Sequence, residues 1–290
     1  MKEEINEFLD YLAEEKHYSK HTLAAYNNDL KQLANFVETK KPGVMLDSPR
    51  FKLEETILLE YLHELKEKKY RPATVARKVA AVKSFFRFMK KQGKMAEELT
   101  RNLVPPQVKR KKPFVLSVSE VRQLLAEPAK LATPEAKRDK IMLELLYATG
   151  LRVSELVSLD LADINLAKKQ LLCSSRSSRG RVIPLDSVVA DGVKEYIEEA
   201  RVALLQNEKE TGLFLNCRGE CLTRQGFWQI VKDYAHKAGL GVNVTPHTLR
   251  HTFATHKLKS GTSLHSLQEL LGHAYISSTR IYDGLSKGEQ

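Results

Sequence analysis

Residues 245–256 have the sequence TPHTLRHTFATH, and this stretch decides the local fold around the chain's most distinctive polar groups. Thr245 and Pro246 are typical of a helix start, because a threonine hydroxyl caps free backbone amides and proline suits the first turn. A helix that begins there carries His247 and Arg250 three positions apart, on one face. The stretch therefore predicts an imidazole and a guanidinium side by side near the start of a helix.

Two further stretches place polar groups beside glycine breaks. ATGLRVSEL at 148–156 has Arg152 just after Gly150, and GHAYISSTRIYDGLSKGEQ at 272–290 has His273 after Gly272 and Tyr282 further on. Taken singly, each has an ordinary structural explanation, such as a surface ion pair for the arginine or a helix C-terminus for the histidine. Their combination with residues 245–256 is more specific.

Together these groups suit chemistry at a phosphodiester. Two arginines can hold its non-bridging oxygens and offset the extra charge of a pentacovalent transition state. A histidine can move a proton, and a tyrosine hydroxyl can act as the nucleophile. The sequence has no carboxylate cluster suited to Mg²⁺ and no phosphate-binding glycine loop. We therefore predict phosphoryl transfer that uses no metal and no cofactor and conserves the bond energy as a phosphotyrosine.

Composition indicates the class of partner. The chain has 290 residues, enough for two domains, and its 47 lysines and arginines against 36 acidic residues give a net charge of +11. Such an excess favours a polyanionic partner, with nucleic acid the first candidate. Three cysteines do not make a disulfide framework, and Cys217 and Cys221 alone cannot supply four zinc ligands. With no long apolar run and an acidic N-terminus, we expect a soluble, cytoplasmic protein without a membrane partner.

Helical periodicity dominates the chain. Residues 1–103 are predicted to form an all-helical domain, 104–113 a basic linker marked by Pro105 and Pro106, and 114–290 a second domain. The second domain is expected to be mostly helical, with one small antiparallel sheet between about 156 and 185. A capping box from Ser117 to Glu120 and a left-handed C-cap at Gly150 are predicted within it. Its expected helices cover about 117–127, 134–148, 187–206, 223–238, 246–259 and 263–271, and those of the first domain cover about 4–15, a segment after Ser19, 53–68 and a segment from Pro72.

Basic residues gather along the last helix of the first domain and in the linker. Between Arg71 and Lys94 the chain carries no acidic residue, whereas a solvated helix face normally mixes signs. We favour contact with a nucleic-acid backbone over plain solubility, although the linker also suits an ordinary solvated segment. The candidate DNA contacts are Arg71, Arg77, Lys78, Lys83, Arg87, Lys109, Arg110, Lys111 and Lys112.

The chain carries four motifs in the order Arg152, His247 with Arg250, His273 and Tyr282. They resemble the tyrosine recombinase family, with Xer-type chromosome dimer resolvases and related integrases the nearest. The resemblance covers nearly the whole chain, since residues 1–103 look like the family's core-binding domain. It implies a C-shaped clamp on double-stranded DNA, four protomers joined in a synapse on two sites, and strand exchange through a Holliday junction. A role in chromosome partition at cell division is also implied.

The resemblance also implies a role for each motif residue. Arg152 and Arg250 would bind the scissile phosphate, and His273 would hydrogen-bond it. His247 would accept the proton of Tyr282, which would attack and form a 3′-phosphotyrosine. Glu155 would support the site from behind, and Tyr275 is expected to pack or to contact DNA.

The chain departs from the family at two places. Where the family has a lysine that protonates the leaving 5′-oxygen, SRSSRGRVIPL places Arg176, and arginine is a poor proton donor because its pKa lies above about 12. Three explanations compete: another group donates after realignment of the turn, Arg176 serves at a reduced rate, or the chain is catalytically slowed. The segment after Tyr282, DGLSKGEQ, is expected to be too short for the docking helix that related recombinases place on a neighbouring protomer.

Three alternatives stay open. A mobile-element integrase and a type IB-like topoisomerase would use the same chemistry, and a DNA-binding accessory protein would have weakened cleavage. The sequence does not define the recombination site. It also leaves open whether a paralogous recombinase or a DNA translocase takes part.

Overall fold

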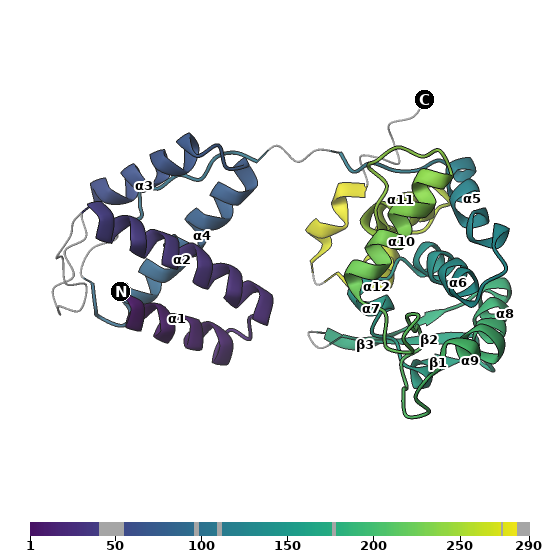
Figure 1. Ribbon diagram of the computed structural model, residues 1–290. Helices are drawn as coiled ribbons and strands as arrows, with labels where there is room; N and C mark the ends of the chain where they lie inside the picture. The colour runs from purple at the N-terminus through teal and green to yellow at the C-terminus, as the bar shows by residue number, and fades with distance from the viewer. Residues whose placement is uncertain (41–54, 96–98, 109–111, 176–177, 274, 283–290) are drawn as a thin grey trace. The chain divides into compact units, whose positions relative to one another are not determined.

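The computed structural model describes residues 1–40, 55–95, 99–108, 112–175, 178–273 and 275–282 (Figure 1). The chain divides into two compact units, Met1–Arg110 and Lys111–Gln290. Both are mainly helical, and the second also holds a small antiparallel sheet, so the predicted fold class is confirmed. Within the ranges described, no helix combines the length and the apolar character that a membrane crossing requires.

The first unit packs its helices around an aromatic core. Phe8 contacts Phe85 edge to face, with ring centroids 5.6 Å apart, and Leu33 and Leu58 are fully buried beside them. The Ser19 hydroxyl caps the second helix by accepting the Thr22 amide at 3.2 Å. The helices described in this unit are α1 (Lys2–Glu14), α2 (Lys20–Lys40), α3 (Glu55–Glu67) and α4 (Pro72–Lys91).

One predicted DNA contact on α4 is wrong. Lys78 is only 2% exposed, and its ammonium donates to Asp29 Oδ1 at 3.0 Å and to Gln32 Oε1 at 2.6 Å, both on α2. Arg77 pairs with the other oxygen of the same carboxylate. The helical phase explains the error, because Lys78 shares the inward face with Val75. The lysine therefore serves packing between α2 and α4 and is not available to a phosphate backbone.

This buried pair gives a stability prediction. Asp29→Asn removes the carboxylate and leaves the Lys78 ammonium buried without a counter-charge, so unfolding should become easier by about 3 kcal/mol. Urea unfolding followed by far-UV circular dichroism measures the change. Glu7→Gln, which removes a solvent-exposed partner of Lys94 in the same unit, is the matched control and should have little effect. Equal effects of the two variants would contradict the assignment.

The second unit is built around α6 (Pro134–Thr149). Met142, Leu143, Leu145 and Leu146 of this helix are all fully buried, because other helices surround it. The predicted capping box of Ser117 with Glu120 is confirmed at the start of α5. The remaining helices are α5 (Val118–Ala126), η1 (Pro128–Lys130), α7 (Val153–Leu156), η2 (Leu161–Asp163), α8 (Ser187–Glu195), η3 (Tyr196–Ala200), α9 (Arg201–Leu204), α10 (Arg224–Lys237), α11 (Pro246–Lys259), α12 (Leu264–Leu271), η4 (Ile276–Ser278) and η5 (Arg280–Tyr282).

The sheet and one long helix differ in detail from the prediction. The sheet begins later than expected, at residue 164, because the short helices α7 and η2 occupy the residues before it. Its antiparallel strands are β1 (Ile164–Asn165), β2 (Gln170–Ser175) and β3 (Ser178–Pro184), in the order β1-β2-β3. The helix expected at 187–206 is interrupted by one π-helical turn, η3, between α8 and α9.

Two glycines end the helices that lead into the polar cluster of this unit. Gly150 after α6 and Gly272 after α12 both adopt left-handed conformations, with φ of 62° and 61°. A Cβ at Gly150 would overlap the Phe253 ring of α11, so the close approach of α6 and α11 also requires glycine. Each glycine turns the chain so that a polar side chain enters this cluster. Arg152 lies two positions after Gly150, and His273 directly follows Gly272.

Candidate active site

The start of α11 follows from its sequence. Thr245 caps the helix by accepting the Thr248 amide at 3.2 Å, and Pro246 occupies the first turn. This start directs Arg250 into the protein, where it is 4% exposed. The predicted helix and cap are thus confirmed, and the arginine they carry is buried.

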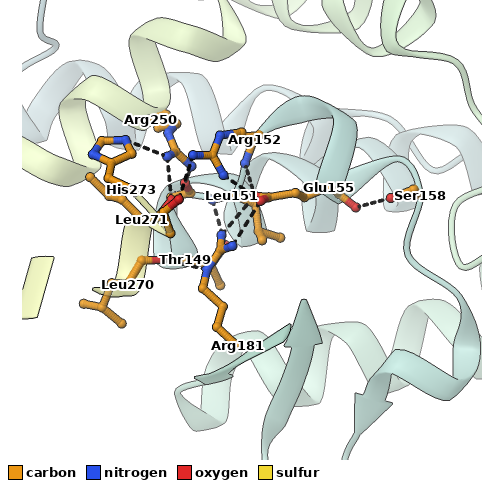
Figure 2. Close-up of polar contacts among 12 residues, drawn as sticks. Thr149, Leu151, Arg152, Glu155, Ser158, Arg181, Arg250, Leu270, Leu271 and His273 are labelled. Atoms are coloured by element: carbon orange, nitrogen blue, oxygen red, sulfur yellow. Dashed lines mark hydrogen bonds and ion pairs between the residues drawn. The ribbon is translucent and has the colours of Figure 1, made fainter. Parts of the chain in front are cut away.

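Backbone carbonyls at the two glycine breaks hold the two predicted arginines. Arg250 donates to the carbonyls of Gly150 and, at 2.8 Å, Leu271. Arg152 donates to the carbonyl of Gly272 at 2.9 Å, and its side chain is 40% exposed. Figure 2 shows both guanidinium groups converging beside His273. One arginine is therefore fixed inside the protein, while the other remains open to solvent and to a ligand.

Glu155 links Arg152 to a third arginine that the sequence analysis did not select. Its carboxylate accepts the Arg152 backbone amide at 2.7 Å and the Arg152 guanidinium at 2.9 Å. Arg181 of β3 donates to both oxygens of the same carboxylate, at 3.0 and 2.9 Å. Although burial opposes ionisation, these hydrogen bonds and charges lower the pKa of Glu155 to about 2. The expected supporting position of Glu155 is observed, and alternation along β3 was the signal that could have found Arg181, since Val182 is exposed and Ile183 is buried.

The cluster carries a positive charge suited to an anion. Three guanidinium groups, those of Arg152, Arg181 and Arg250, face the single carboxylate of Glu155, so two positive charges are left uncompensated. Burial and the neighbouring Arg152 lower the pKa of Arg250 to about 10, which still leaves it charged at neutral pH. A phosphodiester would relieve this repulsion, and the half-exposed Arg152 gives it access.

His273 lies beside the buried arginine in a defined protonation state. Arg250 donates to its Nε2 at 3.1 Å, and its Nδ1 lies 2.9 Å from the Thr279 hydroxyl. Burial, with Arg250 and Arg152 nearby, lowers the pKa of His273 to about 4, so the ring is neutral at pH 7. Because arginine has no acceptor, Nε2 accepts and the ring proton is on Nδ1. His273 must change tautomer or gain a proton before it can donate from Nε2 to a phosphate.

The Tyr282 hydroxyl contacts a histidine other than the predicted one. It lies 2.8 Å from Nδ1 of His251, while His247 stacks on the His251 ring with centroids 4.6 Å apart. Burial, followed by the charges of His247 and Arg250, lowers the pKa of His251 to about 4, so a neutral ring can accept the tyrosine proton. The spacing of His247 and His251, one helical turn apart on α11, was the signal that could have found the second histidine.

Tyr282 itself is buried. It is 2% exposed and packs with Phe253, Leu267 and Leu271, and burial raises its pKa although Arg250 and Arg152 act in the opposite direction. Tyr275, by contrast, is 75% exposed and therefore does not pack in the core. The two tyrosines of the last segment thus have opposite environments.

The neutral histidines predict a dependence of stability on pH. His251 and His273 have pKa values of about 4 in the folded chain, whereas a histidine in an unfolded chain titrates near 6.5. Between these values the unfolded chain binds more protons, so stability is full above about pH 6.5 and falls as the pH approaches 4. Urea unfolding should therefore shift to lower concentration from pH 7 to pH 5. Fluorescence of Trp228, the chain's single tryptophan, reports this unit.

The matched variant for this prediction is His251→Gln, which removes one of the rings whose pKa is lowered to about 4. Its unfolding midpoint should fall less between pH 7 and pH 5 than that of the parent chain. If the variant keeps the full dependence, the pKa of His251 is the same in the folded and the unfolded chain, and burial does not lower it.

Several predicted positions lie outside the described residues. These are Arg176, Lys109, Arg110 and Lys111, whereas Lys112 is described and exposed. Arg71, directly before α4, and Arg87, on α4, are exposed, and Lys83 is half-buried. Within the described part of the chain, no three potential metal-ligating side chains gather into one group. The charged cluster is therefore built from arginine and histidine around a single carboxylate.

The second unit brings two arginines, a neutral histidine and a buried tyrosine together, a set of groups that suits an enzyme of phosphoryl transfer. Residues 115–289 match the model of the phage integrase family, and residues 5–93 match that of the phage integrase N-terminal SAM-like domain. The chain therefore belongs to the phage integrase family, the tyrosine recombinases.

Relatives along nearly the full chain agree with this family. Tyrosine recombinase XerC of Herpetosiphon aurantiacus is 44% identical over 99% of this chain and 92% of its own length. Tyrosine recombinase XerD of Oceanobacillus iheyensis is 38% identical over 98% of this chain and 94% of its own length.

Solved structures share the fold. The XerH site-specific recombinase bound to a palindromic difH substrate has a TM-score of 0.75 and 21% identity, covering 98% of this chain and 92% of its own. A lambda integrase (75–356) dimer bound to a COC′ core site has a TM-score of 0.74 and 17% identity, covering 100% of this chain and 97% of its own.

Proposed function

We propose that the chain is a site-specific recombinase that cleaves and rejoins strands of double-stranded DNA through a phosphotyrosine at Tyr282. The observation that carries this proposal is the cluster in which Arg152, Arg250 and His273 meet beside the contact of Tyr282 with His251. An uncompensated positive charge, a tyrosine hydroxyl and a neutral base are the groups that such a transfer requires.

The chemistry balances without an outside reagent. The Tyr282 oxygen attacks the scissile phosphorus, its proton passes to His251, and the bond from phosphorus to the 5′-oxygen breaks. Arg152 and Arg250 hold the non-bridging oxygens as negative charge builds on them. The leaving 5′-oxygen takes up a proton from a general acid, so the products are a 3′-phosphotyrosine and a free 5′-hydroxyl, and attack by a 5′-hydroxyl reverses the step. His247 stacks against His251, and its charge adds to the effect of burial in lowering the pKa of His251.

Tyr282 has to move before it can attack. Its hydroxyl is buried in contact with His251, and its ring packs beside Phe253 and Leu271. A scissile phosphate bound by the exposed Arg152 lies on the solvent side of the cluster, since that side chain is 40% exposed. DNA binding must therefore coincide with displacement of the short segment that carries the tyrosine. Arg176 remains our candidate for the group that protonates the leaving 5′-oxygen.

DNA contact through the first unit rests on fewer residues than the sequence predicted. Arg71, directly before α4, and Arg87, on α4, are exposed, and with Lys83 and the linker residues they remain candidate phosphate contacts. Arg77 is 42% exposed but already pairs with Asp29, so it contributes less free charge. We propose that this reduced set, together with Lys109, Arg110, Lys111 and Lys112, tracks the backbone of the duplex.

We favour chromosome dimer resolution over integration of a mobile element. The support is identity of 38–44% to proteins named XerC and XerD over nearly their full lengths. This role would require four protomers on two sites and exchange through a Holliday junction, in the cytoplasm. A paralogous recombinase and a DNA translocase are the partners that such a reaction could use.

Covalent trapping tests the proposed function. Genomic fragments of the source organism are selected on the protein and sequenced, and the recovered site is synthesised with a nick close to the cleavage position so that the cut product diffuses away. A protein–DNA adduct that survives denaturation, with the DNA joined through its 3′ end, supports the proposal. Tight binding without any adduct would instead favour an accessory protein.

The recovered sequences distinguish the two biological roles. Paired half-sites near a replication terminus would support dimer resolution. Sites that flank mobile DNA would support integration and overturn the chromosomal assignment.

A further inference from the structure

Arg181 of β3 is bonded through every nitrogen of its guanidinium. Nη1 and Nη2 donate to the two oxygens of Glu155, and Nε donates to the Leu270 carbonyl at 2.9 Å (Figure 2). The side chain is 14% exposed, and Arg181 lies opposite the buried Cys173 in the sheet. Such a two-point fork on a carboxylate is a geometry that lysine cannot reproduce.

One partner of Arg181 also binds Arg152, and the other directly precedes a group that binds Arg250. Glu155 also accepts from Arg152, and Leu270 directly precedes the Leu271 carbonyl that accepts from Arg250. Gly272 provides a further constraint, because a Cβ there would lie 2.6 Å from Arg181 Nη1. The guanidinium therefore lies against the backbone of the same glycine whose carbonyl accepts from Arg152.

The charges show what Arg181 contributes. Glu155 is buried and ionised, and without Arg181 its nearest cation would be Arg152 alone. A carboxylate with a single partner would then compete with a phosphate for the Arg152 guanidinium. With Arg181 present, the carboxylate already has a full partner that faces the protein interior.

We propose that Arg181 is a positioning residue that neutralises Glu155 and so keeps the charge of Arg152 available to the scissile phosphate. This inference rests on the proposed function. It gives strand β3 a role in the reaction through Arg181, and this role does not depend on the residues between β2 and β3. Arg181 touches no reacting atom and acts through Glu155 and Arg152.

A double-mutant cycle on cleavage tests the inference. The parent chain, Arg181→Gln, Glu155→Gln and the double variant are compared in single-turnover cleavage of the nicked substrate, at saturating protein. Arg181→Gln should slow cleavage by about 10- to 100-fold, the equivalent of a lost charge-assisted hydrogen bond. In the Glu155→Gln background the same substitution should change the rate by less than about threefold, because no carboxylate remains to compete for Arg152. If Arg181 had a purely structural role, Arg181→Gln would slow cleavage both in the parent chain and in the Glu155→Gln background.

Folding is controlled separately. The double variant buries neither charge of the pair, whereas each single variant leaves one charge without its partner, so each cleavage rate is normalised to the folded fraction of that variant. Trp228 fluorescence checks that each variant is folded. A further loss of more than about threefold on adding Arg181→Gln to Glu155→Gln would overturn the inference, as would an unchanged rate for Arg181→Gln alone. Failure of the parent chain to cleave would instead count against the proposed function.

Discussion

Tyr282→Phe should abolish the covalent protein–DNA species and leave DNA binding unchanged. The phenylalanine ring keeps the packing against Phe253 and Leu271, while the lost hydrogen bond to His251 costs only about 1 kcal/mol. The protein should therefore stay folded and bind its site, yet lack the oxygen that attacks phosphorus. The measurement is denaturing electrophoresis of protein incubated with the nicked substrate, beside a native gel shift with the same preparation.

Tyr275→Phe is the matched control for this variant. It removes the same hydroxyl from the same segment, but from a side chain that is 75% exposed, and should retain adduct formation. An adduct in Tyr282→Phe would show that another side chain is the nucleophile. Loss of the adduct in both variants would show that the segment, rather than one hydroxyl, is required.

Arg250→Lys should reduce strand cleavage by about 100- to 1000-fold, the usual effect of removing one donor to a developing oxyanion. The substitution keeps a positive charge but removes the fork that joins Gly150, Leu271 and His273. A single ammonium cannot serve these partners and the phosphate together. Single-turnover cleavage at saturating protein measures the effect, because it separates the chemical step from DNA affinity.

Arg201→Lys is the control for burial and stability. Arg201 is 5% exposed and donates to the carbonyls of Glu210 and Gly212, so its replacement should weaken the fold in a similar way. Its cleavage rate, normalised to folded protein, should stay near that of the parent chain. A similar loss in both variants would mean that Arg250 acts only as a scaffold.

Local sequence accounts for most of the secondary structure. The caps at Ser117 and Thr245 and the left-handed Gly150 depend on hydrogen bonds between residues three or four positions apart, and all were predictable. The unpredicted features depend on longer-range packing. The helices before β1 and the π-helical turn after α8 belong to this group.

The candidate site also contains residues that the sequence predicted and residues that only the packing brought to light. The sequence selected Arg152, His247, Arg250, His273 and Tyr282 by residue type and order. It did not select Arg181 or His251, since a lone arginine on a strand and a second histidine on a helix are ordinary. It also placed Lys78 on the surface because composition outweighed the helical phase.

By itself the sequence determined the candidate reactive groups, their order and the helices that carry them, because caps and periodicity are set by neighbours within one turn. The tertiary structure alone decided which groups touch. Arg250 reaches the carbonyl of Gly150 across 100 positions, and Arg152 that of Gly272 across 120. It also decided that Tyr282 rests against His251 and that Arg181 shares Glu155 with Arg152. Such contacts depend on how helices and sheet pack, which no short stretch of sequence encodes.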